Sequence, residues 1–162
     1  MGWNKLPDEL EDKVKSEIGG TYEKKAGSEK IYQPKTGEKE AKLIIPGELP
    51  TENEIIDKAK THWAKYKKMK DTYDSLVKVF SEKHEIPFFE TILLQITYYR
   101  KNRMYDPDNI CSAKKFILDG LQKAGVIKND GWKVVKGFQE TWEVNKNNPR
   151  TEVIIKEVED ES

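Results

Sequence analysis

The feature that most constrains this chain is a helix-like segment between two strand-like segments. Residues 107–124 repeat apolar side chains at three- and four-residue steps, which is the spacing of one helix face: Ile110, Ala113, Ile117, Leu121 and Ala124. Gly125 follows, a residue type that commonly ends a helix. Residues 88–99 alternate between two faces, one of them more apolar, and residues 133–144 form another strand candidate. The segment therefore predicts strand, helix, strand.

Further elements are predicted on both sides of this unit. A strand at 42–45 precedes a turn, and Thr51 to Glu54 has the Ser/Thr-x-x-Glu form of a capping box that opens a long helix. We expect the apolar residues of that helix to enter the core: Ile55, Ala59, Trp63, Tyr66, Tyr73, Val77 and Phe80. A last strand is predicted at 151–158. The order β-α-β-α-β-β indicates an α+β domain, a small mixed sheet packed with two helices.

The length of 162 residues suits one domain with short additions. Residues 1–40 read as an N-terminal extension, with a short helix at 5–18 and a polar linker after it. The folded domain is predicted at 41–158, and 159–162 form an acidic tail. No apolar run is long enough to span a bilayer, so we expect a cytoplasmic protein without a membrane partner.

The net charge is zero, but the charges are unevenly distributed. Residues 41–158 carry 21 basic and 17 acidic side chains, and residues 58–70 contain six lysines and no acid. Such a block attracts phosphate backbones, although a solvated helix face is the simpler interpretation.

Acidic residues gather around the start of the helix at 107–124. On a regular helix Asp108, Lys115 and Asp119 share the face opposite the apolar stripe. Asp106 and Asp130 join them only if tertiary folding brings them there. Clustered carboxylates suit Mg²⁺, which polarises phosphoryl oxygens beside a stabilising lysine. The same residues also fit a helix cap, an exposed ion pair and a turn, so both interpretations stay open.

Cysteine chemistry is excluded more firmly. The chain has one cysteine, Cys111, so no intramolecular disulfide forms, and with two histidines it supplies no four-ligand zinc site. No histidine is placed to activate Cys111 as a nucleophile.

The acidic segment and the helix after it contain a recognisable set of motifs: Asp106-Pro107-Asp108-Asn109, Lys115, residues 116–121 with their Asp-Gly-Leu, Gly125-Val126-Ile127 and Asp130. This set resembles the RusA family of Holliday-junction resolvases of phages and prophages. Residues 47–54 and the lysine-rich helix are similar to the N-terminal half of the family.

The resemblance implies a homodimeric endodeoxyribonuclease that makes paired nicks in four-way DNA junctions with Mg²⁺, or with Mn²⁺ as a substitute. It implies that Asp106, Asp108 and Asp130 bind the metal and are catalytic, and that Lys115 is the catalytic lysine. Expected DNA contacts come from Asn53, Lys58, Lys65, Lys67, Lys68, Arg100, Arg103 and Asn109.

Two departures from the family pattern leave alternatives open. The interval from Asp108 to Asp119 is longer than in the shortest members, which makes Lys114 the other candidate for the lysine. Asn129 stands where an acid often precedes the last aspartate. The competing functions are a non-catalytic nucleic-acid-binding accessory protein of recombination and a metal-dependent hydrolase of small phosphate esters.

Overall fold

The structure is a computed structural model, and it describes residues 39–159. The predicted helix at 5–18, almost all of the predicted linker and the end of the acidic tail lie outside the described residues. The first strand already includes Glu40, which pairs with Lys156 in the sheet.

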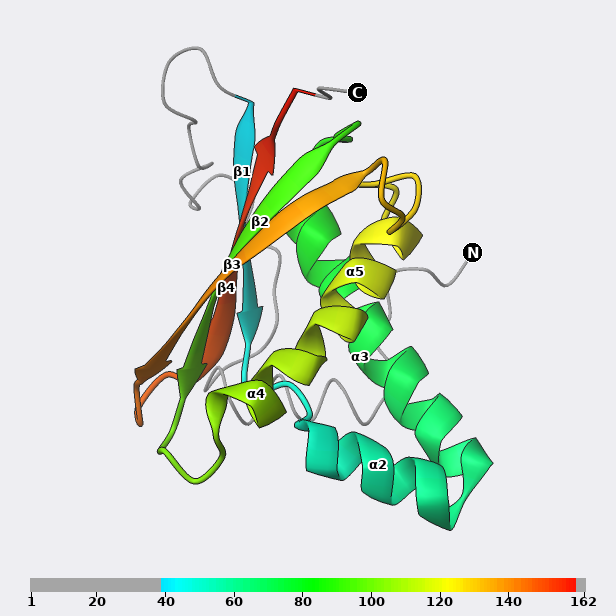
Figure 1. The fold of residues 1–162 in the computed structure, drawn as a ribbon, viewed down its shortest axis with the longest axis vertical. Helices are drawn as coiled ribbons and strands as arrows, with labels where there is room; N and C mark the ends of the chain where they lie inside the picture. The colour runs from blue at the N-terminus through cyan, green and yellow to red at the C-terminus, as the bar shows by residue number, and fades with distance from the viewer. Residues whose placement is uncertain (1–38, 160–162) are drawn as a thin grey trace.

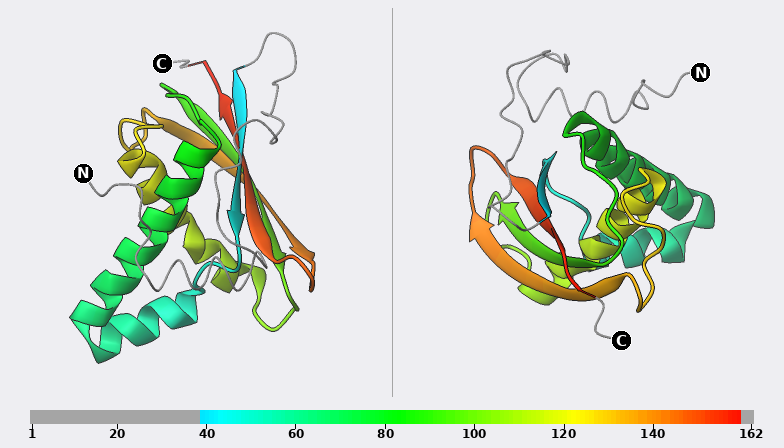
Figure 2. Two further views of the ribbon diagram at one scale, coloured as in Figure 1. Left: turned by 180° about the vertical axis from the view of Figure 1, so that it is seen from behind. Right: turned by 90° about the horizontal axis from the view of Figure 1, so that it is seen from above.

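The described chain forms a mixed four-stranded sheet with helices on one face (Figures 1 and 2). Along the chain the elements are β1 (Glu40–Pro46), α2 (Glu52–Thr61), α3 (Trp63–Lys83), β2 (Ile92–Arg100), α4 (Pro107–Ile110), the 3₁₀ turn η1 (Cys111–Ala113), α5 (Lys114–Lys123), β3 (Val135–Val144) and β4 (Arg150–Glu157). The predicted α+β class, the small mixed sheet and the positions of its four strands along the chain are confirmed, whereas each of the two predicted helices is divided into shorter helical segments. Among residues 39–159, none of the helices combines the length and apolar character that a membrane span requires.

The sheet has the strand order β1-β4-β2-β3. β4 pairs antiparallel with both β1 and β2, whereas β3 pairs parallel with β2. A parallel pair needs a crossover, and α4, η1 and α5 supply it by running back over one face of the sheet. Because β3 is last in the strand order, it is an edge strand, and its start lies beside the start of β2.

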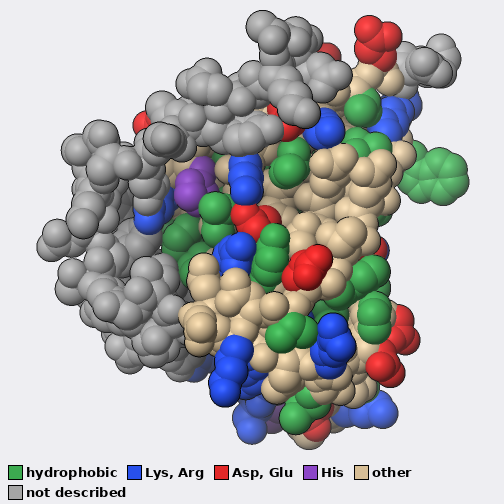
Figure 3. Space-filling model, turned by 90° about the vertical axis from the view of Figure 1, so that its left-hand side faces the viewer, with side chains coloured by type: hydrophobic (Ala, Val, Ile, Leu, Met, Phe, Trp, Pro, Cys, Tyr) green, Lys and Arg blue, Asp and Glu red, His purple; other side chains and the backbone are tan. Residues whose placement is uncertain are grey.

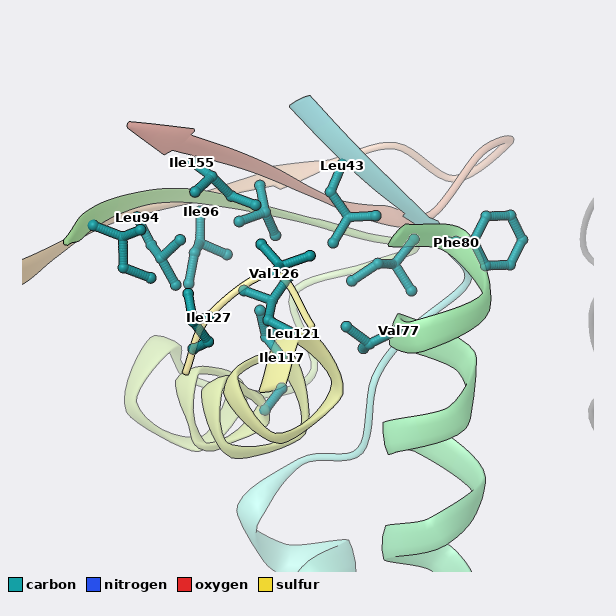
Figure 4. Packing of buried hydrophobic residues seen from close by; sticks show 14 of the residues in the cluster. Leu43, Val77, Phe80, Leu94, Ile96, Ile117, Leu121, Val126, Ile127 and Ile155 are labelled. Carbon is teal, nitrogen blue, oxygen red and sulfur yellow. The ribbon is translucent and has the colours of Figure 1, made fainter. Parts of the chain in front are cut away.

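The core lies between the sheet and the helices (Figure 4). Leu94 and Ile96 of β2 and Ile155 of β4 meet Ile117 and Leu121 of α5 there, all at most 1% exposed. Four of the five residues in the predicted stripe at 107–124 are buried: Ile110, Ala113, Ile117 and Leu121. The helical period therefore located this face of the core correctly.

The long helix predicted after Thr51 is two helices. The predicted capping box at Thr51 is present, but the chain breaks at His62, which is extended and ends α2. His62 also starts α3, because its Nδ1 accepts a hydrogen bond from the Ala64 N–H at 3.3 Å. α2 has no buried residue and Trp63 is 70% exposed, so the prediction that these side chains enter the core was wrong for this part of the helix.

Close contact between α3 and α5 depends on Gly120. A Cβ atom at this position would lie 2.3 Å from Val77 Cβ and 2.9 Å from the backbone oxygen of Asp74. Both neighbours belong to the rigid, buried part of α3, so neither yields without moving the helix. The two helices approach this closely only because residue 120 has no side chain.

We therefore expect Gly120→Ala to destabilise the domain by about 1–3 kcal/mol, the usual cost of overpacking a core. Urea unfolding followed by circular dichroism measures the change. Gly137→Ala is the matched control, because its added Cβ meets only Leu93 Cδ1 at an ordinary 3.6 Å. Equal stabilities for the two variants would contradict this account of the α3–α5 contact.

Candidate active site and nucleic-acid interface

The acidic segment lies where the chain leaves β2 and starts α4. Pro107 occupies the first turn of α4, and Asp106 is its N-cap residue with extended backbone. The Asp106 side chain makes no capping hydrogen bond. Asp106 and Asp108 are both exposed, and no ion pair joins either to a described lysine or arginine. Two carboxylates are thus left two residues apart at the surface.

Two hydrogen bonds join the lysine-rich helices to the acidic segment and to the helix after it. The Asn53 N–H donates to Asn109 Oδ1 at 3.0 Å, which ties the start of α2 to α4. Lys115 Nζ donates to the Tyr66 hydroxyl at 3.2 Å, which ties the start of α5 to the first turns of α3. Asn109 and Lys115 therefore hold the lysine-rich part of the chain beside Asp106 and Asp108.

We call α2 together with the first two turns of α3 the basic arm, because it extends away from the sheet (Figures 1 and 2). Lys65 and Lys67 are exposed on it, and Lys67 Nζ lies 5.6 Å from the ring centre of the exposed Trp63. Lys58, half-buried, and Lys68, exposed, are on the same arm. A set of cations on an element that contributes no buried side chain is a surface suited to phosphates.

Arg100 differs from the other expected DNA contacts. It is 8% exposed, its Nε lies 2.9 Å from Glu48 Oε2, and its Nη1 donates to the Leu49 carbonyl. This arrangement anchors the loop after β1 to the end of β2, so Arg100 is a structural residue and is not free for phosphate. Arg103 is exposed near the acidic segment.

Asp130 lies at the opposite end of the sheet from Asp106 and Asp108. It is exposed in the turn before β3, where Asn129 Oδ1 accepts the Gly131 N–H at 2.9 Å. β3 starts beside the start of β2, whereas Asp106 follows the end of β2. Within residues 39–159, no three His, Cys, Asp or Glu side chains lie together as a metal site. The Asp106–Asp108 pair suits Mg²⁺, which often takes one or two carboxylates, but Asp130 does not join the pair within one chain.

Asp119 is not part of the acidic site. The prediction that it shares a face with Asp108 assumed a regular helix, and the 3₁₀ turn η1 interrupts that helix. Asp119 Oδ2 instead lies 2.9 Å from Lys70 Nζ of α3. Lys70 also bonds to Asp74 at 2.7 Å, and Lys123 reaches the same carboxylate at 3.1 Å.

This charge cluster between α3 and α5, in which only Asp74 is fully buried, was missed from the sequence. Asp74 is fully buried, and its Oδ1 has no hydrogen-bond partner among the described residues. Burial alone would lower the pKa of Lys70, but the carboxylates of Asp74 and Asp119 outweigh burial and raise it. In the sequence, Asp74 falls on the apolar side of α3, between Lys70 and Val77. An acidic residue on that side was the sequence signal from which the charge cluster could have been predicted.

Lys114 and Lys115 have different surroundings. Lys114 Nζ bonds to Glu140 Oε2 at 3.1 Å and lies 4.9 Å from the Phe138 ring centre. The buried Tyr98 hydroxyl donates to the other oxygen of Glu140 at 2.9 Å. Burial, reinforced by the Glu140 carboxylate, raises the pKa of Tyr98 well above its usual range. Lys115 is exposed, and its Nζ contacts the Tyr66 side chain, 3.2 Å from the hydroxyl and 5.9 Å from the ring centre.

This difference predicts unequal effects of the two lysines on stability. Lys114→Ala should cost about 1–2 kcal/mol, because it leaves the mostly buried Glu140 carboxylate without its cation. Lys115→Ala, the matched control one residue away, should change stability by less than about 0.5 kcal/mol. Urea unfolding at one chain concentration measures both. A stability loss confined to Lys115→Ala would reverse the structural roles assigned to the two lysines.

Cys111 has a local role. Its Sγ–H donates to the Asp108 carbonyl at 3.2 Å, and its side chain is half-buried. This bond lies inside the α4–η1 turn and helps to hold the backbone that carries Asp108.

No protein-family model matches this sequence, and no curated protein matches it. Any functional inference therefore depends on the residues of the motif and on their arrangement in the fold.

Proposed function

We propose that this chain is a RusA-like, Mg²⁺-dependent endodeoxyribonuclease that resolves Holliday junctions by paired nicks in DNA recombination and repair. One observation carries the proposal: Asn109 and Lys115 of the acidic motif hold the basic arm against that motif through Asn53 and Tyr66. A surface that attracts the DNA backbone thereby adjoins exposed carboxylates that suit a divalent ion.

Each residue of the motif has a distinct task in this proposal. Asp106 and Asp108 hold the ion, because their carboxylates are exposed and are not used for capping or ion pairs with described residues. The ion, when bound, supplies charge that polarises the scissile phosphate and activates a water molecule. Lys115 stabilises the additional negative charge on the phosphate. Lys114 is the weaker candidate for that task, because Glu140 already neutralises it.

The first test removes carboxylate charge without changing side-chain size. Asp108→Asn and Asp106→Asn should each lower the single-turnover cleavage rate of a labelled four-way junction on the order of 100-fold or more, with junction affinity retained. Asp71→Asn is the control, because Asp71 is an exposed aspartate of α3 outside the motif. Normal rates for both motif variants at subsaturating Mg²⁺ would remove these residues from the site.

The second test concerns the basic arm. Lys65→Gln and Lys67→Gln together should weaken binding to every DNA form and reduce the slope of log affinity against log salt by about 0.9 per lost phosphate contact. Lys128→Gln with Lys146→Gln is the control, because these exposed lysines lie outside the arm. Fluorescence anisotropy over a salt series measures the slopes. Identical slopes in the two double variants would show that the arm does not contact DNA phosphates and is only a solvated surface.

A non-catalytic nucleic-acid-binding accessory protein is the second candidate. The observation that favours it is the separation of Asp130 from Asp106 and Asp108 within one chain. Incubation with a four-way junction, a linear duplex and a single strand, with Mg²⁺ or EDTA, separates the candidates. Metal-dependent cleavage of the junction alone supports the nuclease, binding without cleavage supports the accessory protein, and turnover of small phosphate esters alone contradicts both.

A further inference from the structure

The bend between α2 and α3, residues 61–64, carries a large aromatic ring at the surface, and we call this bend the elbow. His62 ends α2, and Trp63 is the first residue of α3. The N–H groups of Lys65 and Tyr66 donate to the His62 carbonyl at 3.1 and 3.2 Å, and the His62 ring caps the same turn. Backbone hydrogen bonds therefore fix where Trp63 lies, while its side chain is 70% exposed.

One exposed aromatic residue is ordinary on a protein surface, so its surroundings decide what it means. Residues three and four positions apart share a face of a helix, and Trp63 thereby shares one with Tyr66 and Lys67. Lys67 Nζ lies 5.6 Å from the Trp63 ring centre. Tyr66 accepts the hydrogen bond from Lys115 Nζ. The Trp63 ring therefore belongs to the side of α3 that meets the start of α5.

The charges along the elbow have one sign. Residues 58–70 contain six lysines and no acidic residue. Lys60, Lys65 and Lys67 are exposed, and none of the three forms an ion pair with a described acidic residue. On the side of the molecule that the sheet occupies, by contrast, positive and negative side chains are interspersed with apolar ones (Figure 3). The elbow thus combines an exposed ring with cations that have no described acidic partner.

A single strand of nucleic acid offers both groups that such a surface binds. Its phosphates attract lysines, and an aromatic side chain stacks on the flat face of a base. In a duplex the neighbouring base pairs cover these faces, so only an unpaired base is available for stacking. A membrane surface fits less well, because an interfacial helix buries a broad apolar face. The basic arm, all of which the structure describes, exposes only two large apolar side chains, Ile56 and Trp63.

We propose that Trp63 is a stacking site for an unpaired base of a DNA strand, with Lys67 bound to an adjacent phosphate. This inference goes beyond the proposed function, because it names the state of the base that the arm recognises and needs neither metal nor cleavage. At 1.5 Å per residue, Trp63 lies on the order of 15 Å along α2 from Asn53, which bonds to Asn109 of the acidic motif. A base held at the elbow is therefore only a few nucleotides from that motif.

Two labelled single strands of equal length separate stacking from charge. One is oligothymidylate, and the other has abasic sites throughout, so that it carries the same phosphates without bases. Trp63→Ala should weaken binding of oligothymidylate about 10-fold, the scale of one lost base–aromatic stack, and leave binding of the abasic strand unchanged. Trp63→Phe should restore most of the lost affinity, because it retains an aromatic ring. Fluorescence anisotropy at one salt concentration measures the affinities.

Trp132→Ala is the matched control, because this ring is 95% exposed and lies outside the arm. It should leave both affinities unchanged. A blunt duplex should bind the Trp63→Ala variant and the wild-type chain equally, because its bases are paired and covered. Equal losses on oligothymidylate and the abasic strand would show that the ring only supports the arm, and this result overturns the proposal. An unchanged affinity for oligothymidylate, or the same loss from Trp132→Ala, also overturns it.

Tryptophan emission gives a second readout of the same contact. Stacking quenches the ring, so saturating oligothymidylate should reduce the emission of the wild-type chain more than that of Trp63→Phe. Equal quenching of the two proteins contradicts the stacking site. Sedimentation velocity and phosphatidylserine vesicles test the other occupants, and self-association or vesicle binding that Trp63→Ala abolishes overturns the proposal. Base-dependent binding without junction cleavage instead overturns the proposed function and leaves this inference standing.

Discussion

The parallel pairing of β2 with β3 is the constraint on which the rest of this structure depends. Two parallel strands of one sheet require a connection that travels the whole length of the strands, and here α4, η1 and α5 provide it. That crossover buries Ile117 and Leu121 against the sheet and brings Gly120 against Val77. It also carries the chain from one end of the sheet to the other, and this separates the acidic residues before it from Asp130 after it.

Local periodicity was sufficient to predict the elements. The four strands, the capping box at Thr51 and most of the apolar stripe in residues 107–124 depend on neighbours in sequence, and the structure confirms them. The failures have non-local causes. Trp63 has the spacing of a core residue, but the start of its helix projects beyond the sheet, and the side chain stays 70% exposed. The prediction that Asp108 and Asp119 share a face assumed one regular helix, whereas η1 lies between them and Asp119 pairs with Lys70 of α3.

The candidate site was predictable only in part for the same reason. Asp106 and Asp108 are close because they are two residues apart. The helical face predicted from the sequence favoured Lys115 over Lys114, and the structure adds their partners, Glu140 for Lys114 and Tyr66 for Lys115. Both partners come from distant parts of the sequence. Arg100 illustrates the reverse case, since a basic residue near the motif is used to hold Glu48 and the Leu49 carbonyl. Residue type identified the candidates, and the fold decided which of them remain available.

The attachment of α2 has a dynamic consequence. α2 contains no buried residue, and it is held by its own cap, by the bond from Asn53 to Asn109 and by contacts with its neighbours. Undocking α2 therefore exposes almost no apolar surface, so its local opening free energy lies far below that of global unfolding. The start of the basic arm is thus free to change its direction while the sheet and the α3–α5 contact stay intact. Under the proposed function, this adjustable start of the basic arm would let the chain accommodate DNA strands that diverge at different angles.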